Sequence, residues 1–302
     1  MRRFSLSLLL FSIFQRLGFH LTRNNFYSPI PDTRVIAKKR ELFLQERELP
    51  GVDINLSGQL RFLNSALAAY SGECNFSAHP THNPYQYYVN NRAFGFLSAA
   101  VLHCMVRHYK PQTLIEVGSG FSTLVSAAAL LQNRKEGHSG ELICIEPYPS
   151  KLLFSKIPGL TQLIATKVEE LKPDFFNRLG ANDILFVDSS HVLRLGGDVR
   201  YLYLDILPRL KKGVIIHIHD IFFPNEYPRD WVLSGLRFWN EQYLLQAFLC
   251  NNHAFQILFC AHLLSLKYSD KLRSVFPLPP ALGSNAKAEY YSSSSFWMKK
   301  IR

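Results

Sequence analysis

The chain has 302 residues, of which 47% are hydrophobic and 19% are charged, which excludes general disorder and provides for a sizeable folded core. The formal net charge is +11, but the lysines and arginines are scattered, and no basic motif interleaved with aromatic residues indicates an RNA-binding module. We therefore interpret the charge as a solvated basic surface and expect no nucleic-acid partner, while attraction to an anionic ligand or a membrane surface is the alternative.

The N-terminus begins with Arg2 and Arg3, which precede an apolar run over residues 4–14. This order resembles the start of a signal peptide, but no small-residue cleavage site follows it. The run is also too short to span a bilayer. We predict a basic amphipathic helix that docks on the protein or lies against a membrane surface.

Residues 1–90 have an irregular pattern, which we interpret as an N-terminal cap. Prolines in residues 26–32 forbid a regular helix there, and the remainder predicts helices over 34–48 and 59–70 and a loop over 77–91. The regular pattern that follows predicts a core domain over residues 91–302.

In the core domain, short apolar runs alternate with helix-length segments, which indicates an α/β fold with a doubly wound, mostly parallel sheet covered on both faces. Helices are predicted over 93–109, 122–132 and 198–210, with one near Phe175, and strands over 114–117, 142–146, 162–166, 184–188 and 214–219. Further helices over 240–251 and 263–275 flank a strand at 254–260, and a final strand at 295–301 follows a loop rich in Pro, Gly and Ser. We expect the last two strands to form an antiparallel edge.

The cysteines and the glycine turn narrow the class of protein. Five cysteines without a CxxC pair favour a reducing, cytoplasmic setting without a disulfide framework or a zinc site.

Gly118-Ser119-Gly120 joins the first strand to a helix, the arrangement that brings a ligand close to free backbone N–H groups. Glu146, at the end of the second strand, stands where a ribose is bound in such folds. A dinucleotide fingerprint would need a third glycine where the chain has Thr123.

Polar side chains follow the fourth and fifth strands, where the carboxyl ends of both strands meet at one edge of the sheet. Asp188, His219 and Asp220 are predicted to bind a divalent cation, for which oxygen ligands favour Mg²⁺ or Mn²⁺. His191 is the predicted general base. Alternation along the fifth strand places His217 on the same face as His219, and hydrogen-bonded histidines that line a cleft without metal are the alternative. Glu241 is interpreted as a favourable charge at the start of a helix.

Several segments together resemble class I S-adenosylmethionine-dependent methyltransferases, and more narrowly the bacterial group called "methyltransferase 24". They are EVGSGFST (116–123), ICIEP (143–147), ILFVDSSH (184–191) and GVIIHIHDIFFPNEYP (213–228), followed by WNEQYLLQAFL (239–249). The resemblance covers residues 90–302, and the segment GFHLTRNNFYSPIPD (18–32) also resembles the leader of this group.

The resemblance implies a seven-stranded sheet with a reversed last strand, and S-adenosylmethionine as the cofactor. We assign cofactor contacts to Glu116, Gly118, Ser119, Gly120, Glu146 and Asp188. The chain is also similar to metal-dependent O-methyltransferases of the catechol and macrolide-sugar types, whose pattern Asp188, His191 and Asp220 match, whereas His219 departs from it. The implied catalytic residues are His191 and Asp188.

The leading hypothesis is therefore S-adenosylmethionine-dependent O-methylation of a hydroxylated small molecule or sugar, with divalent-metal assistance left open. A nicotinamide-dependent oxidoreductase is a second hypothesis, against which the missing third glycine counts. A non-catalytic, membrane-peripheral binding protein on the same fold is the third.

Overall fold

The computed structural model describes residues 6–279, 282 and 288–302. Arg2 and Arg3 of the predicted N-terminal helix lie outside the described residues, as does part of the predicted loop before the last strand. The chain forms two compact units, one of Met1–Gln45 with Glu226–Phe238 and one of Glu46–Asn225 with Trp239–Arg302. Residues 46–90, which we assigned to the cap, belong to the same unit as the sheet.

The smaller unit contains α1 (Leu6–Arg16), α2 (Thr33–Lys38), α3 (Glu41–Leu44) and α9 (Arg229–Leu233). The side chain of Asp32 caps α2 by accepting a hydrogen bond from the backbone N–H of Arg34 at 2.9 Å. The single helix predicted over 34–48 is wrong, because the backbone leaves the helical region at Lys39 (φ −94°, ψ 67°) and restarts as α3.

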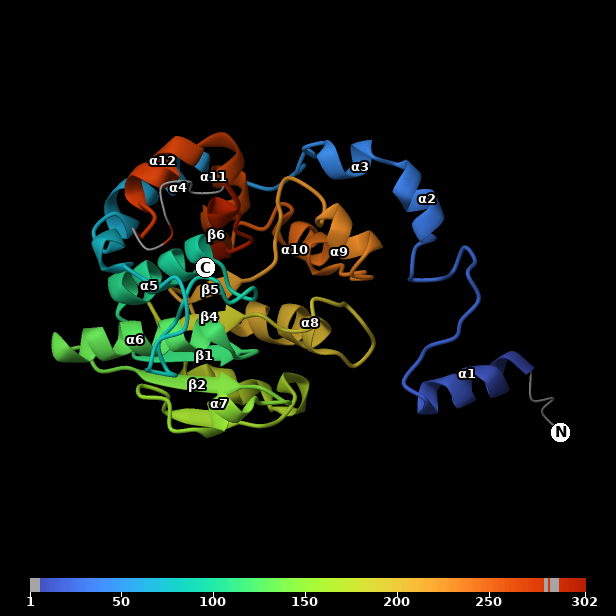
Figure 1. The fold of residues 1–302 in the computed structure, drawn as a ribbon, viewed down its shortest axis with the longest axis horizontal. Helices are drawn as coiled ribbons and strands as arrows, with labels where there is room; N and C mark the ends of the chain where they lie inside the picture. Colours follow the sequence, from blue (N-terminus) through green and yellow to red (C-terminus); the bar gives the residue numbers. More distant parts are fainter. Residues whose placement is uncertain (1–5, 280–281, 283–287) are drawn as a thin grey trace. The chain divides into compact units, whose positions relative to one another are not determined.

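The larger unit is built on a seven-stranded sheet (Figure 1), whose strand order is β3-β2-β1-β4-β5-β7-β6. The strands are β1 (Thr113–Val117), β2 (Glu141–Ile145), β3 (Gln162–Ile164), β4 (Ile184–Val187), β5 (Ile215–Ile218), β6 (Phe255–Cys260) and β7 (Phe296–Lys300). The first five are parallel, and β7 is antiparallel to both β5 and β6. The doubly wound, mostly parallel sheet with a reversed last strand is confirmed. The expected antiparallel edge formed by the last two strands is also confirmed, with β6 as the outermost strand and β7 between β5 and β6.

Alternate residues of the strands pack into two hydrophobic cores, one on each face of the sheet. In β1, Leu114 belongs to one core and Ile115 to the other. The first core also takes side chains from α5 (Phe96–Tyr109) and α6 (Phe121–Lys135), and the second from α8 (Asp198–Tyr201) and α10 (Glu241–Leu249). This packing fixes the carboxyl ends of β1, β2, β4 and β5, where the polar residues lie.

The other helices of this unit are α4 (Leu56–Phe62), α7 (Lys151–Phe154), α11 (Ala261–Lys267) and α12 (Ser269–Val275). The helix predicted over 263–275 is interrupted at Tyr268 (φ −138°), which separates α11 from α12. The helix predicted over 198–210 changes after α8 into a π-helical stretch, Leu202–Ile206, and a 3-10 turn, Leu207–Arg209. Pro208 cannot donate a backbone hydrogen bond, which accounts for the end of the regular helix.

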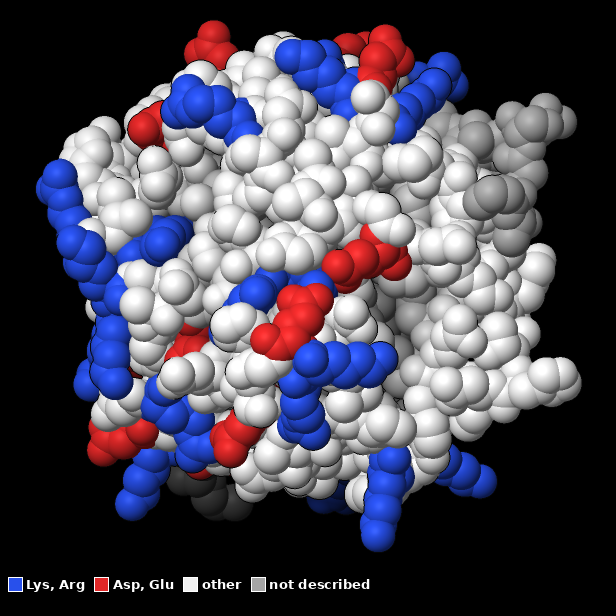
Figure 2. Space-filling model, turned by 90° about the vertical axis from the view of Figure 1, so that its left-hand side faces the viewer, with Lys and Arg blue, Asp and Glu red and all other residues white. Residues whose placement is uncertain are grey.

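On the face of the molecule shown in Figure 2, Lys and Arg side chains follow one another along the left margin, and acidic side chains lie among basic ones over the rest of the face. In the part of the chain that the structure describes, no helix is both long and apolar enough to cross a membrane.

Candidate active site

The turn after β1 depends on glycine at one position. Gly118 has a φ of +81°, and a Cβ there would lie 1.8 Å from the carbonyl oxygen of Asp188. The backbone is held on both sides, because Gly118 N–H donates to Ile145 at 2.9 Å and Asp188 N–H donates to Val117 at 2.8 Å. Gly120 has an extended φ of −178°, and a Cβ there would meet no atom within 4 Å. Gly118 therefore permits the close approach of β1 and β4, while Gly120 leaves open space at the start of α6.

Glu116 lies behind this turn and is fully buried. One of its oxygens, Oε1, accepts hydrogen bonds from Ser122 Oγ at 2.6 Å and Thr123 Oγ1 at 3.0 Å, both in the first turn of α6. The other oxygen, Oε2, has no hydrogen-bond partner in the described chain. Burial raises the pKa of Glu116 to about 8, although the two hydroxyls favour the ionised form. Thr123 also accepts the N–H of Gly120 at 3.0 Å, so the residue that replaces the third glycine caps the helix.

A cavity of about 310 Å³ lies at the carboxyl ends of β1, β2 and β4. The carboxylate of Glu146 stands in its wall and accepts two backbone N–H groups, from Ser119 at 3.2 Å and from Tyr148 at 2.8 Å. These bonds orient the carboxylate, and the volume is within the usual range for a small-ligand pocket. The remaining lining residues are Val117, Gly118, Ile145, Pro147, Tyr148, Lys167, Val168, Glu169, Asp188, Ser189, Ser190, Arg194 and Asp198.

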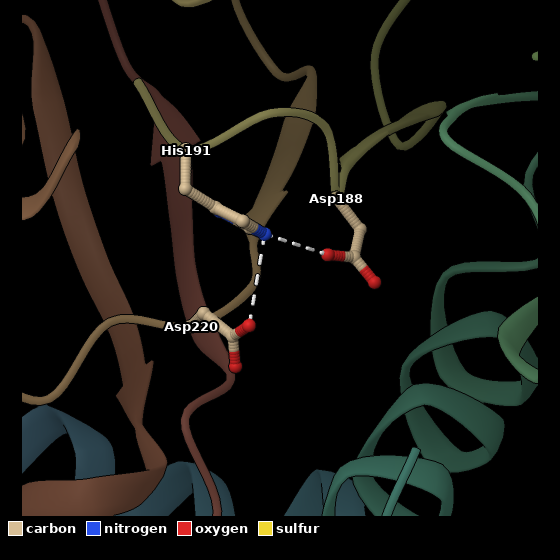
Figure 3. A group of neighbouring side chains, drawn as sticks. All are labelled: Asp188, His191 and Asp220. Carbon is tan, nitrogen blue, oxygen red and sulfur yellow. Dashed lines mark ion pairs between the residues drawn. The ribbon is translucent and has the colours of Figure 1, made fainter. Parts of the chain in front are cut away.

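Beside this cavity, Asp188, His191 and Asp220 converge from the ends of β4 and β5 (Figure 3). Nε2 of His191 lies 3.2 Å from Asp188 Oδ1 and 3.6 Å from Asp220 Oδ2. His191 (φ 59°) and Asp220 (φ 57°) both adopt the left-handed backbone region, which is strained for residues with a side chain and is common at functional sites. In the described chain, these three residues offer atoms close enough to share one metal ion. His191 thus takes the place that we predicted for His219.

His219 packs against the same two carboxylates from another side. Its Nδ1 lies 3.2 Å from Asp220 Oδ1 and 3.8 Å from Asp188 Oδ1, and its Nε2 lies 3.4 Å from Ser98 Oγ. Burial disfavours the charged ring, but Asp220 and Asp188 outweigh burial and raise the pKa of His219. A protonated His219 would place a positive charge beside both aspartates.

The alternative in which His217 is a hydrogen-bonded histidine that lines a polar cleft is wrong. His217 is fully buried, and its ring stacks on Phe186 with centroids 4.1 Å apart and lies 4.5 Å from the ring of Trp297. These two residues are its direct neighbours on β4 and β7. Neither ring nitrogen has a hydrogen-bond partner in the described chain, and burial, together with His219, lowers the pKa well below its ordinary value. His217 is therefore a neutral packing residue.

Glu241 is the site residue whose role the sequence did not reveal. It is fully buried at the start of α10, and its Oε2 lies 2.8 Å from His191 Nδ1. The backbone N–H groups of Asn240 and Glu241 both donate to the carbonyl of His191, at 3.1 and 3.2 Å, and Trp239 packs against the imidazole with centroids 4.3 Å apart. Burial raises the pKa of Glu241 above its ordinary value, although His191 acts in the opposite direction. An acid in the first turn of a helix is common for reasons of the helix dipole alone, so nothing in the sequence distinguished it.

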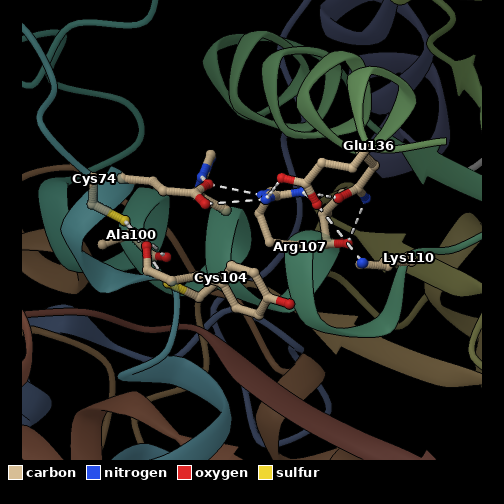
Figure 4. Close-up of polar contacts among 11 residues, drawn as sticks. Cys74, Ala100, Cys104, Arg107, Lys110 and Glu136 are labelled. Carbon is tan, nitrogen blue, oxygen red and sulfur yellow. Dashed lines mark hydrogen bonds and ion pairs between the residues drawn. The ribbon is translucent and has the colours of Figure 1, made fainter. Parts of the chain in front are cut away.

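A second buried polar group surrounds Arg107 and lies outside this site (Figure 4). The guanidinium forms ion pairs with Glu73, at 2.8 Å, and with Glu136, and both carboxylates raise the pKa of Arg107. Nearby, the free cysteines Cys74 and Cys104 have sulfur atoms 3.8 Å apart. The group joins α5 and α6 to the segment before them, and we interpret it as structural.

Known proteins are similar to parts of this chain. Residues 115–221 match a family model described as a methyltransferase domain. An uncharacterized protein of Archaeoglobus fulgidus is 33% identical over 188 residues, which are 59% of this chain and 83% of that protein. The crystal structure of the plantazolicin methyltransferase BamL, in complex with a triazolic desmethylPZN analog and SAH, aligns over 83% of this chain and all of its own, with 11% identity and a TM-score of 0.40. The chain belongs to the class I S-adenosylmethionine-dependent methyltransferases, in the family defined by this methyltransferase domain.

Proposed function

We propose that the protein transfers the methyl group of S-adenosylmethionine to a hydroxyl oxygen of a small molecule or sugar, and that His191 accepts the hydroxyl proton. The observation that carries this proposal is the pairing of His191 with the buried Glu241, which orients the imidazole beside the cavity at the end of β1. The nicotinamide-dependent alternative conflicts with the family to which the chain belongs.

The cavity and its wall fit the proposed cofactor. S-adenosylmethionine supplies an activated methyl group on a sulfonium centre, and Glu146 is the residue that we assign to its ribose hydroxyls. Two backbone N–H groups already hold this carboxylate in place, so little side-chain freedom is lost when a ligand binds. The backbone of Gly118-Ser119-Gly120, with Glu116 behind it, is assigned to the methionine part. Asp188 lies in the lining of the cavity and also contacts His191, so it connects the two halves of the site.

On the acceptor side, Glu241 fixes the orientation of His191. A carboxylate on Nδ1 selects the ring tautomer and directs Nε2 toward the space between Asp188 and Asp220. Burial lowers the pKa of His191, but Asp188 and Glu241 outweigh burial and raise it well above its ordinary value, so Nε2 would first have to release its own proton before it takes the proton of the acceptor hydroxyl. Removing that proton makes the oxygen a better nucleophile, while the site holds it close to the methyl group.

Asp188 and Asp220 also fit a divalent cation, since two carboxylates and a histidine form a donor set that Mg²⁺ or Mn²⁺ accepts when water completes the shell. A bound cation would lower the pKa of the acceptor hydroxyl. The cation would compete with the His191 ring for both aspartates, and a metal-bound Nε2 could not also accept a proton, so we propose metal assistance as an alternative to His191 as the base.

Methyl-labelled S-adenosylmethionine, incubated with a panel of catechols, hydroxylated small molecules and sugars, tests this function. With an acceptor that is methylated, His191→Asn should lower kcat at least about a hundredfold and change the affinity for S-adenosylmethionine less than twofold. His79→Asn, at an exposed position, is the matched control. Label transfer to amines or thiols but to no hydroxyl would contradict O-methylation, and an unchanged kcat in His191→Asn would contradict the assigned base.

A further inference from the structure

The N-terminal segment concentrates exposed apolar side chains. None of the residues of α1 is buried, although seven of its eleven residues are apolar. Of the 22 large hydrophobic residues that are exposed in the described chain, 11 lie within residues 6–30. They are Leu6, Leu8, Leu9, Leu10, Ile13, Leu17, Phe19, Leu21, Phe26, Tyr27 and Ile30. A patch of this density is unfavourable in water and indicates a surface that is covered in use.

The apolar side chains of α1 follow a helical period. Leu6, Leu9, Leu10 and Ile13 are spaced i, i+3, i+4 and i+7, which places them along one stripe of the helix. Their exposed fractions are 70%, 53%, 37% and 46%. The polar residues Ser12, Gln15 and Arg16 lie on another side of the helix, which also carries Leu8. The helix is therefore amphipathic, and its apolar stripe is exposed.

The charges of residues 1–31 indicate which kind of surface would cover the apolar side chains. Residues 1–31 contain four arginines (Arg2, Arg3, Arg16 and Arg23) and no aspartate or glutamate, although the whole chain has 23 acidic residues. Arg2 and Arg3 are known here from the sequence only. A segment that is apolar, cationic and free of acids complements a bilayer surface with anionic headgroups, to which each arginine contributes attraction.

The length of α1 decides how it would lie. Eleven residues of helix measure about 16 Å at 1.5 Å per residue, about half the 30 Å of a bilayer core. We propose that α1 docks in the plane of an anionic lipid surface, with Leu6, Leu9, Leu10 and Ile13 in the headgroup–acyl boundary and the arginines beside the phosphates. This docking is independent of the proposed methyl transfer.

Co-sedimentation of the full-length protein with vesicles tests the proposal. The wild type should bind vesicles of mixed phosphatidylcholine and phosphatidylglycerol, and binding should weaken as NaCl is raised. The double variant Leu9→Glu/Ile13→Glu should lower the partition coefficient at least tenfold. Leu204→Glu is the matched control, because Leu204 is 54% exposed, close to the 53% of Leu9, and lies in the larger unit. Each of Arg16→Gln and Arg23→Gln should lower binding about fivefold, which corresponds to about 1 kcal/mol for the loss of one positive charge.

Three results would overturn the proposal. The first is equal binding of anionic vesicles by the wild type and by Leu9→Glu/Ile13→Glu. The second is equal binding of the wild type to anionic vesicles and to vesicles of phosphatidylcholine alone, because the arginines would then contribute nothing. The third is a wild-type dimer in analytical ultracentrifugation without vesicles that the double variant converts to a monomer, because a second copy of the chain would then cover α1.

Discussion

Glu116→Gln is expected to remove a pH-dependent loss of stability. The Glu116 carboxyl is fully buried, and burial raises its pKa from 4.5 to about 8 in the folded protein. Glutamine has nearly the same shape, and its oxygen can still accept the hydroxyls of Ser122 and Thr123. Its amide group would take the place of Oε2, which has no hydrogen-bond partner in the described chain. The variant therefore removes the ionisation and keeps the packing.

The direction in which the free energy of unfolding changes with pH follows from whether the folded or the unfolded chain binds the proton. Below pH 4.5 the carboxyl is protonated in both states and contributes no pH dependence. Between pH 4.5 and about 8 the unfolded chain releases the proton while the folded chain keeps it, so the free energy of unfolding falls as pH rises. The slope is about 1.36 kcal/mol per pH unit, and the total over this window has an upper limit of about 5 kcal/mol. Above pH 8 the loss is complete.

Urea unfolding at pH values from about 5 to 8.5, at constant ionic strength, measures this effect. We expect the free energy of unfolding of Glu116→Gln, minus that of the wild type, to rise with pH by about 1 kcal/mol per unit, since other titrating groups cancel in the difference. The exposed Glu141→Gln is the matched control for the loss of one carboxyl. A difference between Glu116→Gln and the wild type that stays constant with pH would refute the reasoning.

Three further predictions concern the turn and the acceptor side of the site. Gly118→Ala should lower the free energy of unfolding by more than about 3 kcal/mol, because its Cβ would overlap the carbonyl of Asp188. Gly120→Ala should change the free energy of unfolding by no more than about 1 kcal/mol. Thermal melting of both variants measures this, and equal melting temperatures of the two variants would contradict the prediction. Glu241→Gln should lower kcat at least about tenfold and leave the KM for S-adenosylmethionine unchanged, because a neutral amide oxygen accepts the Nδ1–H of His191 less strongly than a carboxylate does. Steady-state kinetics check this, and a loss confined to KM would contradict a positioning role. If Asp188 and Asp220 hold an assisting cation, EDTA should lower turnover and Mg²⁺ or Mn²⁺ should restore it, whereas turnover that EDTA leaves unchanged would argue against the metal.

Much of the sheet could be predicted because parallel strands buried on both faces are short apolar runs in the sequence. The positions of β1, β2, β4 and β5 follow from such runs to within one or two residues. The insertion of β7 between β5 and β6 could not be predicted in this way, because strand order depends on contacts between distant segments. The helix breaks at Lys39 and Tyr268 were missed for a different reason, since each depends on the backbone conformation of one residue.

In the candidate active site, too, some features could be predicted from the sequence and others could not. Asp188, His191 and Asp220 lie together because their strands are adjacent and end at one edge of the sheet, as the sequence allowed us to expect. His217 was misplaced because alternation gives the face of a strand but not the neighbours, here Phe186 and Trp297, that close over it. Glu241 was missed because α10 brings it to His191 from 50 residues away.

Isothermal titration with S-adenosylmethionine, with and without Mg²⁺, tests the central claim most directly. The account predicts that the wild-type protein binds S-adenosylmethionine at one site, and that Glu146→Ala weakens this binding at least about tenfold, because the carboxylate in the cavity wall is lost. Glu141→Ala, on the exposed first residue of β2, should bind as the wild type does. An absence of binding under both conditions, or equal affinity in Glu146→Ala, would contradict the account.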